Sequence, residues 1–332
     1  MRGFDIFNGP ETRLQVNLFS VRQGDFMFGR LFFRRAVYFL LFSLILTFFN
    51  FGVSCSVVSP GDEGRSLEAQ RLETQNARNS KLRIAQIKVY PAKKALKENQ
   101  KLLMEILKEI EALGQVDVVI TPEGFLDGYV STDADIGKKD MAQYAIDQND
   151  SEYVREISQW AKRNNSWFIY GCTRREGLDV YNTALIFNRT GELVGTYDKT
   201  HLQAHDFKYK AGGHLNVFDS DFGKFGVMIC ADRRWPETSR ALAMKGARVI
   251  FNPTYGFYDD LNLAMMRTRS YENGIYIAFT HPDQSLITGP LGEIVQNNKD
   301  KKERFVITNI DLSNATAEKN NHIADRRTDL YK

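Results

Sequence analysis

The sequence is poor in cysteine and histidine, the side chains from which disulfide frameworks and zinc sites are built. Its 332 residues contain three cysteines and five histidines, with no CxxC or HExxH motif. Cys55, Cys172 and Cys230 are too few and too scattered for a disulfide framework. His201 and His205 are four residues apart, but Gln203 and Asp206 indicate a loop there, so we expect no metal site and no cofactor.

An excess of basic residues is also lacking. Lys and Arg total 44 against 41 Asp and Glu, and residues 1–80 hold 9 of the arginines and 7 of the acids. The rest of the chain is therefore almost neutral, which excludes a basic stripe for nucleic acid. A hydrophobic content of 43%, with 12% aromatic residues, is enough for the core of a globular protein.

The N-terminal part has the layout of an export signal. Residues 1–29 show no periodicity and are left unassigned. We expect translation to start at Met27, so that residues 1–26 come from a start site placed too far upstream. Residues 30–58 begin with three arginines, continue through an apolar run from residue 36 and end in small residues. That order of regions is typical of a secretory signal.

Three fates of this segment remain open. Cleavage would secrete the protein, lipidation of Cys55 would anchor it, and an uncleaved segment 36–55 would attach it to a membrane. Gly52 stands where a lipoprotein signal usually has a Leu-like residue. Each fate places the protein outside the cytoplasm. Residues 59–80 lack aromatic side chains and are rich in charge, which predicts a flexible linker.

From residue 82 to residue 332 the pattern alternates between strand and helix and predicts one α/β domain. Two strands around a turn at 184–197, and a second hairpin at 286–295, indicate antiparallel pairs inserted among βα units and hence mixed sheets. Further strands are expected at 82–89, 117–120, 167–172, 227–229, 248–251, 275–279 and 305–310, and helices at 96–113, 154–161, 236–245 and 265–273.

The segment 225–237 contains a candidate nucleophile. An apolar run ends at Cys230 and is followed by polar and charged residues and by Pro236, which predicts a strand, a sharp turn and a helix N-terminus. The unpaired N–H groups of a helix N-terminus favour a thiolate, so Cys230 is a candidate nucleophile. A buried cysteine at the end of a core strand is the alternative.

Glu123 and Lys199 also follow predicted strands, and reactive groups of α/β proteins gather where strands end. A thiol can attack a carbonyl carbon while a carboxylate moves the proton and an ammonium stabilises the oxyanion. The sequence therefore predicts a hydrolytic site of Glu123, Lys199 and Cys230. Taken singly, Glu123 is better explained as a turn cap and Lys199 as a solvated loop charge, and only their joint position at strand ends favours the site.

Three segments, Thr121–Phe125 with Gly128–Tyr129, Asp198–Leu202 and Gly226–Glu237, resemble the signature segments of the nitrilase, or carbon–nitrogen hydrolase, superfamily. The resemblance covers about residues 82–332 and implies an α-β-β-α sandwich that forms a homodimer or a higher homo-oligomer. It implies that Glu123 is the general base, Lys199 the oxyanion stabiliser and Cys230 the nucleophile, with the backbone N–H of Ala231 in the oxyanion hole.

The resemblance also bears on Asp206 and His201. Many members carry a second glutamate that orients the lysine, and Asp206 is its best positional match, one methylene shorter. His201 is a possible base for the cysteine, although its place beside Lys199 favours a structural part.

The sequence from Cys230 to Glu237 is similar to the branch that cleaves N-carbamoyl amino acids, with Ala231 in place of its usual Asn. In that branch arginines recognise the substrate carboxylate, which Arg233 and Arg234 suit because a guanidinium offers two parallel N–H groups. An ion pair with Asp232 or Glu237 is the alternative for either arginine. Further residues expected to line the pocket are Asn252, Thr254 and Tyr255.

These observations predict a thiol-dependent hydrolase of a non-peptide C–N bond, an amide or an N-carbamoyl group, that releases ammonia. The expected partner is a small-molecule substrate. Nitrile hydrolysis and an exported binding protein that uses the same pocket without turnover are the alternatives.

Overall fold

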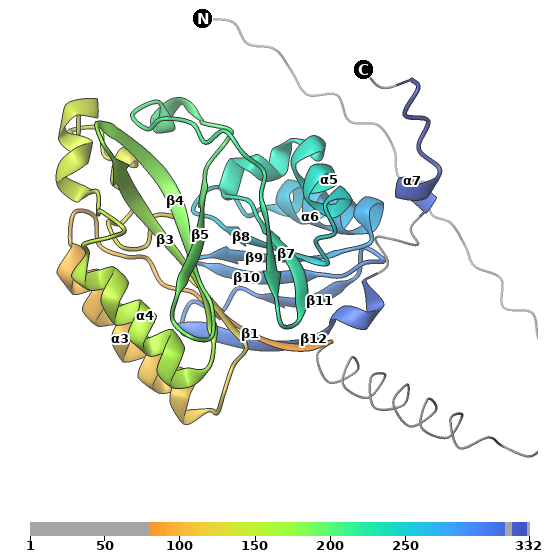
Figure 1. Ribbon diagram of the computed structural model, residues 1–332, viewed down its shortest axis with the longest axis horizontal. Coiled ribbons are helices and arrows are strands. Elements are labelled where there is room, and N and C mark those ends of the chain that lie inside the picture. Colours follow the sequence, from red (N-terminus) through yellow and green to blue (C-terminus); the bar gives the residue numbers. More distant parts are fainter. Residues whose placement is uncertain (1–79, 316–320, 331–332) are drawn as a thin grey trace, which may run out of the picture. The chain divides into compact units, whose positions relative to one another are not determined.

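The computed structural model describes residues 80–315 and 321–330, in which two mixed six-stranded sheets form the centre of the fold (Figure 1). The first sheet has the order β12-β1-β2-β3-β4-β5 and the second the order β11-β10-β9-β8-β7-β6. Strands β1 to β3 are parallel, as are β7 to β9, and hairpins extend both sheets. The prediction of mixed sheets is confirmed.

Each of the two sheets consists of six strands. The first sheet consists of β1 (Lys81–Ile87), β2 (Val118–Ile120), β3 (Trp167–Glu176), β4 (Asp179–Phe187), β5 (Leu193–Asp198) and β12 (Phe305–Asp311). The second sheet consists of β6 (Val217–Ser220), β7 (Gly223–Val227), β8 (Val249–Pro253), β9 (Tyr276–His281), β10 (Gln284–Thr288) and β11 (Ile294–Asn298).

The two sheets pack face to face through an apolar layer. Alternate side chains of each strand point inward because the side-chain period of a strand is two. Ile84 and Ile169 of the first sheet belong to one buried cluster with Val227 and Phe251 of the second. Gln86 adds a polar link in this layer, since its Nε2 donates to the Phe279 carbonyl at 2.8 Å.

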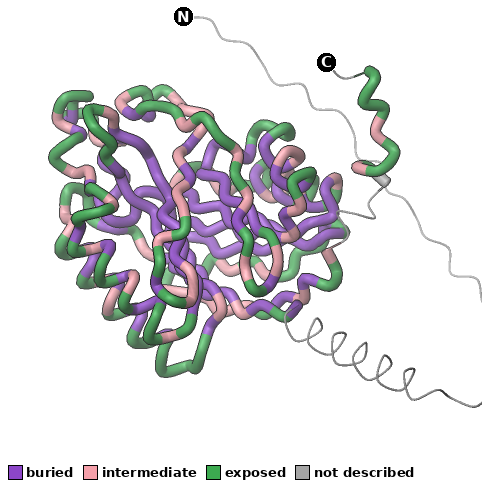
Figure 2. Tube along the Cα trace, viewed as in Figure 1, coloured by how far each residue is buried: buried purple, intermediate pink, exposed green. Residues whose placement is uncertain are grey.

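Helices cover the outer faces of both sheets. α3 (Leu96–Ala112) and α4 (Glu152–Asn164) pack on the first sheet, and α5 (Pro236–Met244) and α6 (Asp260–Asn273) pack on the second. Figure 2 shows the buried strands between helices that are exposed on one side. The sequence explains this burial, because the apolar residues of α3 recur at helical spacing. The layers confirm the α-β-β-α sandwich.

Three hairpins were not expected from the sequence: β3–β4 around Gly177, β6–β7 before Cys230, and β9–β10 around residues 282–283. The strand expected at 227–229 ends instead at Val227, because the N–H of Ile229 donates to the Asp232 carboxylate rather than to a neighbouring strand. A 3-10 turn, η4 (Cys230–Arg234), then precedes α5. Helix α7 (Asn321–Ala324) is short.

The predicted export signal and residues 59–79 of the predicted linker lie outside the described residues, and Ser80, the last residue of that linker, is buried directly before β1. Within residues 80–315 and 321–330, no helix is both long and apolar enough to cross a membrane.

The packing of α3 gives a prediction about stability. Leu107 is fully buried against the first sheet, so Leu107→Ala should lower the free energy of unfolding by about 2–5 kcal/mol. Leu178, in the β3–β4 turn, is fully exposed, and Leu178→Ala should change stability by no more than about 0.5 kcal/mol. Urea denaturation of both variants measures this, and equal losses would contradict the packing described.

Candidate active site

Loops from both sheets bring the three candidate residues together. Glu123 comes shortly after β2 and Lys199 directly after β5, both in the first sheet, whereas Cys230 comes after β7 in the second. Lys199 Nζ lies 2.8 Å from Glu123 Oε1, and both groups are close enough to Cys230 to shift the pKa of its thiol. The site therefore forms where strand ends of the two sheets meet.

The loop that carries Glu123 is held against β3. Thr121 donates its N–H to the Ile169 carbonyl, and its hydroxyl accepts the N–H of Gly171 at 2.8 Å. Position 171 requires glycine, since a Cβ there would lie 2.3 Å from the carbonyl oxygen of Pro122. These contacts fix the backbone that leads into Glu123.

The two oxygens of Glu123 have different surroundings. Oε1 accepts hydrogen bonds from Lys199 Nζ and from Asn182 Nδ2, each at 2.8 Å. Oε2 is buried and has no hydrogen-bond partner in the described part of the chain. A buried carboxylate oxygen without a donor is suited to accept a proton, which is the chemistry of a general base.

Lys199 is fully buried and donates three hydrogen bonds. Nζ lies 2.6 Å from Asp206 Oδ2, 2.8 Å from Glu123 Oε1 and 3.1 Å from the hydroxyl of Tyr129. Burial alone would lower the pKa of Lys199, but the charges of Glu123, Cys230 and Asp206 outweigh it and raise that pKa above its usual value. The ammonium thus stays charged. A substrate oxyanion would have to share these protons or displace the longest contact.

Asp206 reaches Lys199 although it is shorter than a glutamate. The turn η3 (Ala204–Asp206) carries its carboxylate into the site, where Oδ1 also accepts the hydroxyl of Tyr129 at 2.6 Å. His205 Nε2 lies 3.0 Å from the same hydroxyl. Burial, together with the charges of Glu123 and Asp206, raises the pKa of Tyr129 well above its usual value, so Tyr129 remains a neutral donor.

Cys230 occupies a strained backbone conformation. Its φ of 44° lies in the left-handed region, which costs a residue with a side chain about 1–2 kcal/mol. Asp232 stabilises the turn, because its buried carboxylate accepts the N–H groups of Ile229 and His201 and the hydroxyl of Tyr197. Strain held in place by surrounding contacts is common at functional sites.

The pKa of the Cys230 thiol is raised, whereas the sequence predicts a thiolate. Burial raises its pKa, and so does the Glu123 charge, while Lys199, Arg233 and the N–H of Tyr255 act in the opposite direction. The sequence places a helix N-terminus at the thiol, but α5 begins only at Pro236. The resting cysteine is therefore a thiol, and a base must remove its proton.

The two arginines that follow differ in position. Arg233 is buried, and its Nη1 lies 3.4 Å from Cys230 Sγ. Arg234 is exposed and donates to Gln203 Oε1. Neither forms an ion pair with Asp232 or Glu237, the alternative weighed above, within the residues that the structure describes.

The other predicted residues differ in whether they contact the Cys230 sulfur or neighbouring backbone. Ala231 is buried in η4 directly after Cys230, and the N–H of Tyr255 faces the thiol. Asn252 Nδ2 donates to the Met228 carbonyl, and the Thr254 hydroxyl donates to the Asn252 carbonyl. The first of these contacts joins the ends of β7 and β8, and the second lies within the end of β8. The expected pocket-lining role of Asn252 and Thr254 stays a prediction.

Other residues of the site were placed differently or missed by sequence reasoning. His201 Nδ1 lies 2.8 Å from Asp232 Oδ1 and the ring stacks on Trp235, which fits a structural part rather than a base. Tyr129 lay within a signature segment without an assigned role. Asn182 is a polar residue inside the apolar strand β4, a signal that could have identified it.

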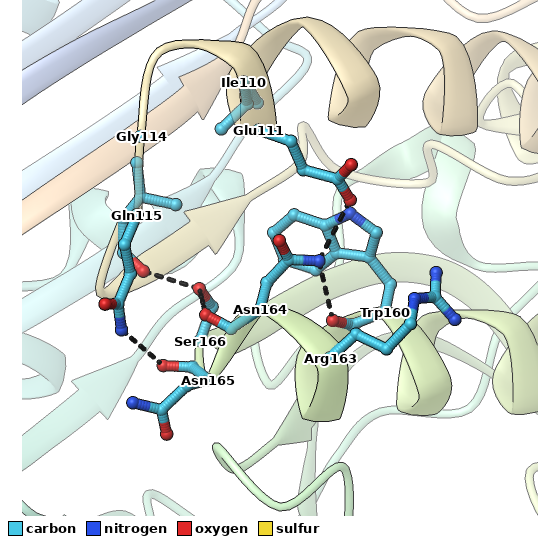
Figure 3. A pocket seen from close by; sticks show the side chains of 10 residues that line it. Ile110, Glu111, Gly114, Gln115, Trp160, Arg163, Asn164, Asn165 and Ser166 are labelled. Carbon is cyan, nitrogen blue, oxygen red and sulfur yellow. Dashed lines mark hydrogen bonds between the residues drawn. The ribbon is translucent and has the colours of Figure 1, made fainter.

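A separate hollow lies at the C-terminal ends of α3 and α4 (Figure 3), away from the residues above. Its polar groups mostly satisfy one another, as where Asn164 Nδ2 donates to Glu111 Oε1. Within residues 80–315 and 321–330, no three His, Cys, Asp or Glu side chains are grouped so that they could hold a metal ion.

Two stacked mixed sheets covered by helices, with a carboxylate, a lysine and a cysteine at their strand ends, define an enzyme-like α/β sandwich. The carbon–nitrogen hydrolase family model matches residues 81–320, and the chain belongs to this family. It is 28% identical over 273 residues to a probable nitrilase of Schizosaccharomyces pombe, covering 76% of this chain and 98% of that protein.

Two crystal structures share the fold. Nit3 of Saccharomyces cerevisiae, a member of branch 10 of the nitrilase superfamily, superposes with a TM-score of 0.61 at 22% identity, covering 76% of this chain and 95% of that one. An amidase from Nesterenkonia sp. superposes with a TM-score of 0.61 at 20% identity, covering 75% and 95%.

His281 packs behind the loop that carries Tyr255 and gives a prediction about pH. Its Nδ1 accepts the N–H of Asp283 at 2.9 Å and its Nε2 lies 3.1 Å from the Tyr255 carbonyl, so the ring is neutral. Burial lowers the pKa of His281 to about 4. The unfolded chain takes up this proton below its normal pKa of about 6.5, whereas the folded chain does so only near 4.

Stability contributed by His281 is therefore present above about pH 6.5 and lost as the pH falls toward 4, by about 3 kcal/mol in all. Urea denaturation at pH 7 and pH 4.5 measures the loss. The variant His281→Asn, which cannot titrate in this range, should lose less over the same interval. An equal loss in both proteins would remove His281 as the cause.

Proposed function

We propose that the protein hydrolyses an amide or N-carbamoyl group of a small molecule and releases ammonia, with Cys230 as nucleophile. The observation that carries this proposal is the unpartnered oxygen of Glu123 in a buried site whose other oxygen is held by Lys199. Such a carboxylate is oriented by one oxygen and reactive at the other. The named relatives, a probable nitrilase and an amidase, support C–N chemistry.

The steps follow from the residues present. Glu123 takes the thiol proton as Sγ attacks the carbonyl carbon, and the charge of Lys199, together with the N–H of Ala231, stabilises the oxyanion. The C–N bond then breaks, the nitrogen takes the proton from Glu123, and ammonia leaves a thioester. Water attacks this thioester through the same carboxylate and restores the thiol. An N-carbamoyl substrate yields a free amine and carbon dioxide as well.

A covalent adduct at cysteine has been seen on the same fold. A mutant of the Nesterenkonia amidase shows covalent addition of the acetamide moiety of fluoroacetamide at its active-site cysteine. This supports a nucleophilic cysteine at this place in the fold, with room beside it for an amide-sized group.

The charge of the arginine pair favours a carboxylated substrate, such as an N-carbamoyl amino acid. Arg234 is exposed. Among the described residues its guanidinium donates one hydrogen bond, to the neutral amide oxygen of Gln203, and it lies 4.9 Å from the Phe257 ring centre. A guanidinium so placed keeps N–H groups for two carboxylate oxygens. Tyr255, whose ring contacts Tyr129, offers an apolar wall for the rest of the substrate.

Two further expectations belong to the same proposal. The arginine-led apolar segment 30–58 supports export, with secretion, a lipid anchor on Cys55 or an uncleaved anchor as its outcomes. The family resemblance supports a homodimer or higher homo-oligomer.

Ammonia release from a panel of N-carbamoyl amino acids, N-carbamoyl amines, simple amides and nitriles tests the proposed reaction. Cys230→Ala should abolish release, and Glu123→Gln should lower it by at least about 100-fold, because proton transfer then lacks its base. Cys172→Ala is the matched control, since Cys172 is a buried thiol in the helix-covered core. It should retain turnover.

If wild type and Cys230→Ala bind an amide ligand equally and neither releases ammonia, the protein is a binding protein rather than an enzyme. If only nitriles are consumed, the amide proposal gives way to nitrile hydrolysis.

The role of Arg234 predicts a selective effect. Arg234→Ala should lower kcat/KM at least about tenfold on carboxylated substrates, which corresponds to the loss of one charge-assisted hydrogen bond, and much less on the corresponding uncharged amides. Steady-state kinetics on matched pairs of substrates measures it. Equal losses on both members of each pair would argue against carboxylate recognition.

A further inference from the structure

Arg233 is a buried cation without a carboxylate partner. Its side chain is among the largest that are fully buried in the described residues, at 1% exposure. In the part of the chain that the structure describes, its hydrogen bonds go to Asn262, Phe257 and Cys230, and none to an Asp or Glu. Buried arginines are normally paired with an acid, because removing an uncompensated charge from water is costly.

The contacts of Arg233 fix its position but leave its charge uncompensated. Nε donates to Asn262 Oδ1 at 2.7 Å and Nη2 to the Phe257 carbonyl at 2.7 Å, both neutral acceptors. The guanidinium also lies over the rings of Phe257 and Phe279, at 4.5 and 5.4 Å from their centres. The remaining contact is Nη1 to Cys230 Sγ at 3.4 Å.

The charges around Cys230 show what this cation can compensate. Glu123 and Asp206 carry two negative charges against the single positive charge of Lys199, so that cluster has one negative charge in excess. A thiolate formed beside it would be repelled. Arg233 approaches the sulfur from its own turn, η4, and supplies the missing positive charge.

We propose that Arg233 is a catalytic residue that stabilises the thiolate of Cys230 and so raises its reactivity. This inference rests on Cys230 as the nucleophile of the proposed function, but not on the identity of the substrate. When the thiol proton moves to Glu123, the negative charge moves to Sγ, which then accepts an N–H from Arg233 as a charge-assisted hydrogen bond.

Other groups also face the sulfur and are unchanged by substitution of Arg233. They are the Glu123 carboxylate, the Lys199 ammonium, the neutral hydroxyl of Tyr129 and the backbone N–H of Tyr255. Burial and Glu123 raise the pKa of the Cys230 thiol, and Lys199 and Arg233 oppose that rise. Loss of Arg233 should therefore leave the thiol harder to ionise.

Alkylation of Cys230 tests the proposal without any substrate. In the reaction with iodoacetamide a bond forms between Sγ and carbon, iodide leaves, and the thiol proton passes to the solvent. The rate of modification of Cys230, followed by peptide mass analysis of the full chain from pH 6 to 9, reports its thiolate fraction. Arg233→Gln should react at least about tenfold more slowly at pH 7, as for a rise of one unit in thiol pKa.

Arg267→Gln is the matched control. Arg267 lies on α6, is exposed and donates to the Gly292 carbonyl. The substitution removes the same charge away from the sulfur, and the variant should alkylate at the wild-type rate. If Arg267→Gln slows alkylation as much as Arg233→Gln, general charge loss explains the effect and the proposal is overturned.

Asn262→Asp is a second variant that keeps the arginine and the side-chain shape. It places a carboxylate within hydrogen-bond distance of Arg233 Nε, so that the negative charge of Asp compensates the positive charge of the guanidinium. This variant should also alkylate several-fold more slowly than wild type. A wild-type rate in Asn262→Asp overturns the proposal even if Arg233→Gln fails to fold.

The anionic reagent iodoacetate separates two roles of Arg233. If Arg233 only bound carboxylates, Arg233→Gln would slow iodoacetate and leave the neutral iodoacetamide unaffected, which would refute thiolate stabilisation. The expected result is slower reaction with both reagents. Absence of ammonia release in every assay, with this alkylation pattern intact, would reject the proposed function while leaving the inference about Arg233.

Discussion

The buried contact between Lys199 and its two carboxylates is the interaction on which the site depends. All three side chains are withdrawn from solvent, and Glu123 and Asp206 come from different loops that the lysine joins. Removing one member would leave a buried charge without its partner, which is strongly destabilising. The cluster therefore fixes the loops after β2 and β5 relative to each other, as well as the orientation of the Glu123 carboxylate.

The cysteine is positioned by a different means. Its loop belongs to the second sheet, and its left-handed backbone is held by Asp232, which takes up N–H groups that would otherwise be unpaired. Gly256 lets the sulfur approach closely, since a Cβ there would lie 3.2 Å from Sγ. One sheet thus supplies Glu123 and Lys199 and the other Cys230, and packing of the two sheets brings them into one site.

Charged side chains that follow strands of both sheets lie near Cys230. Burial, together with the charge of Glu123, raises the pKa of the Cys230 thiol and keeps the cysteine protonated at rest, so a thiolate forms only when a base accepts its proton. Arg233, held by Asn262 and a carbonyl oxygen, lies at the sulfur itself. The proposed hydrolysis therefore rests on four buried groups, Glu123, Asp206, Lys199 and Arg233, whose formal charges sum to zero.

The amino-acid sequence by itself determined the strand and helix alternation, the mixed sheets, and Glu123, Lys199 and Cys230 as candidates, because periodicity and strand ends are local properties of a chain. Only the tertiary structure decided how these side chains meet. The hydrogen bonds of Lys199 to Tyr129 and of Asn182 to Glu123 join residues that are distant in sequence. The contact of Asp206 with Lys199 and the burial of Arg233 depend on how the turns that carry them fold. Local patterns do not encode such distances, since they arise when two sheets pack and exclude water.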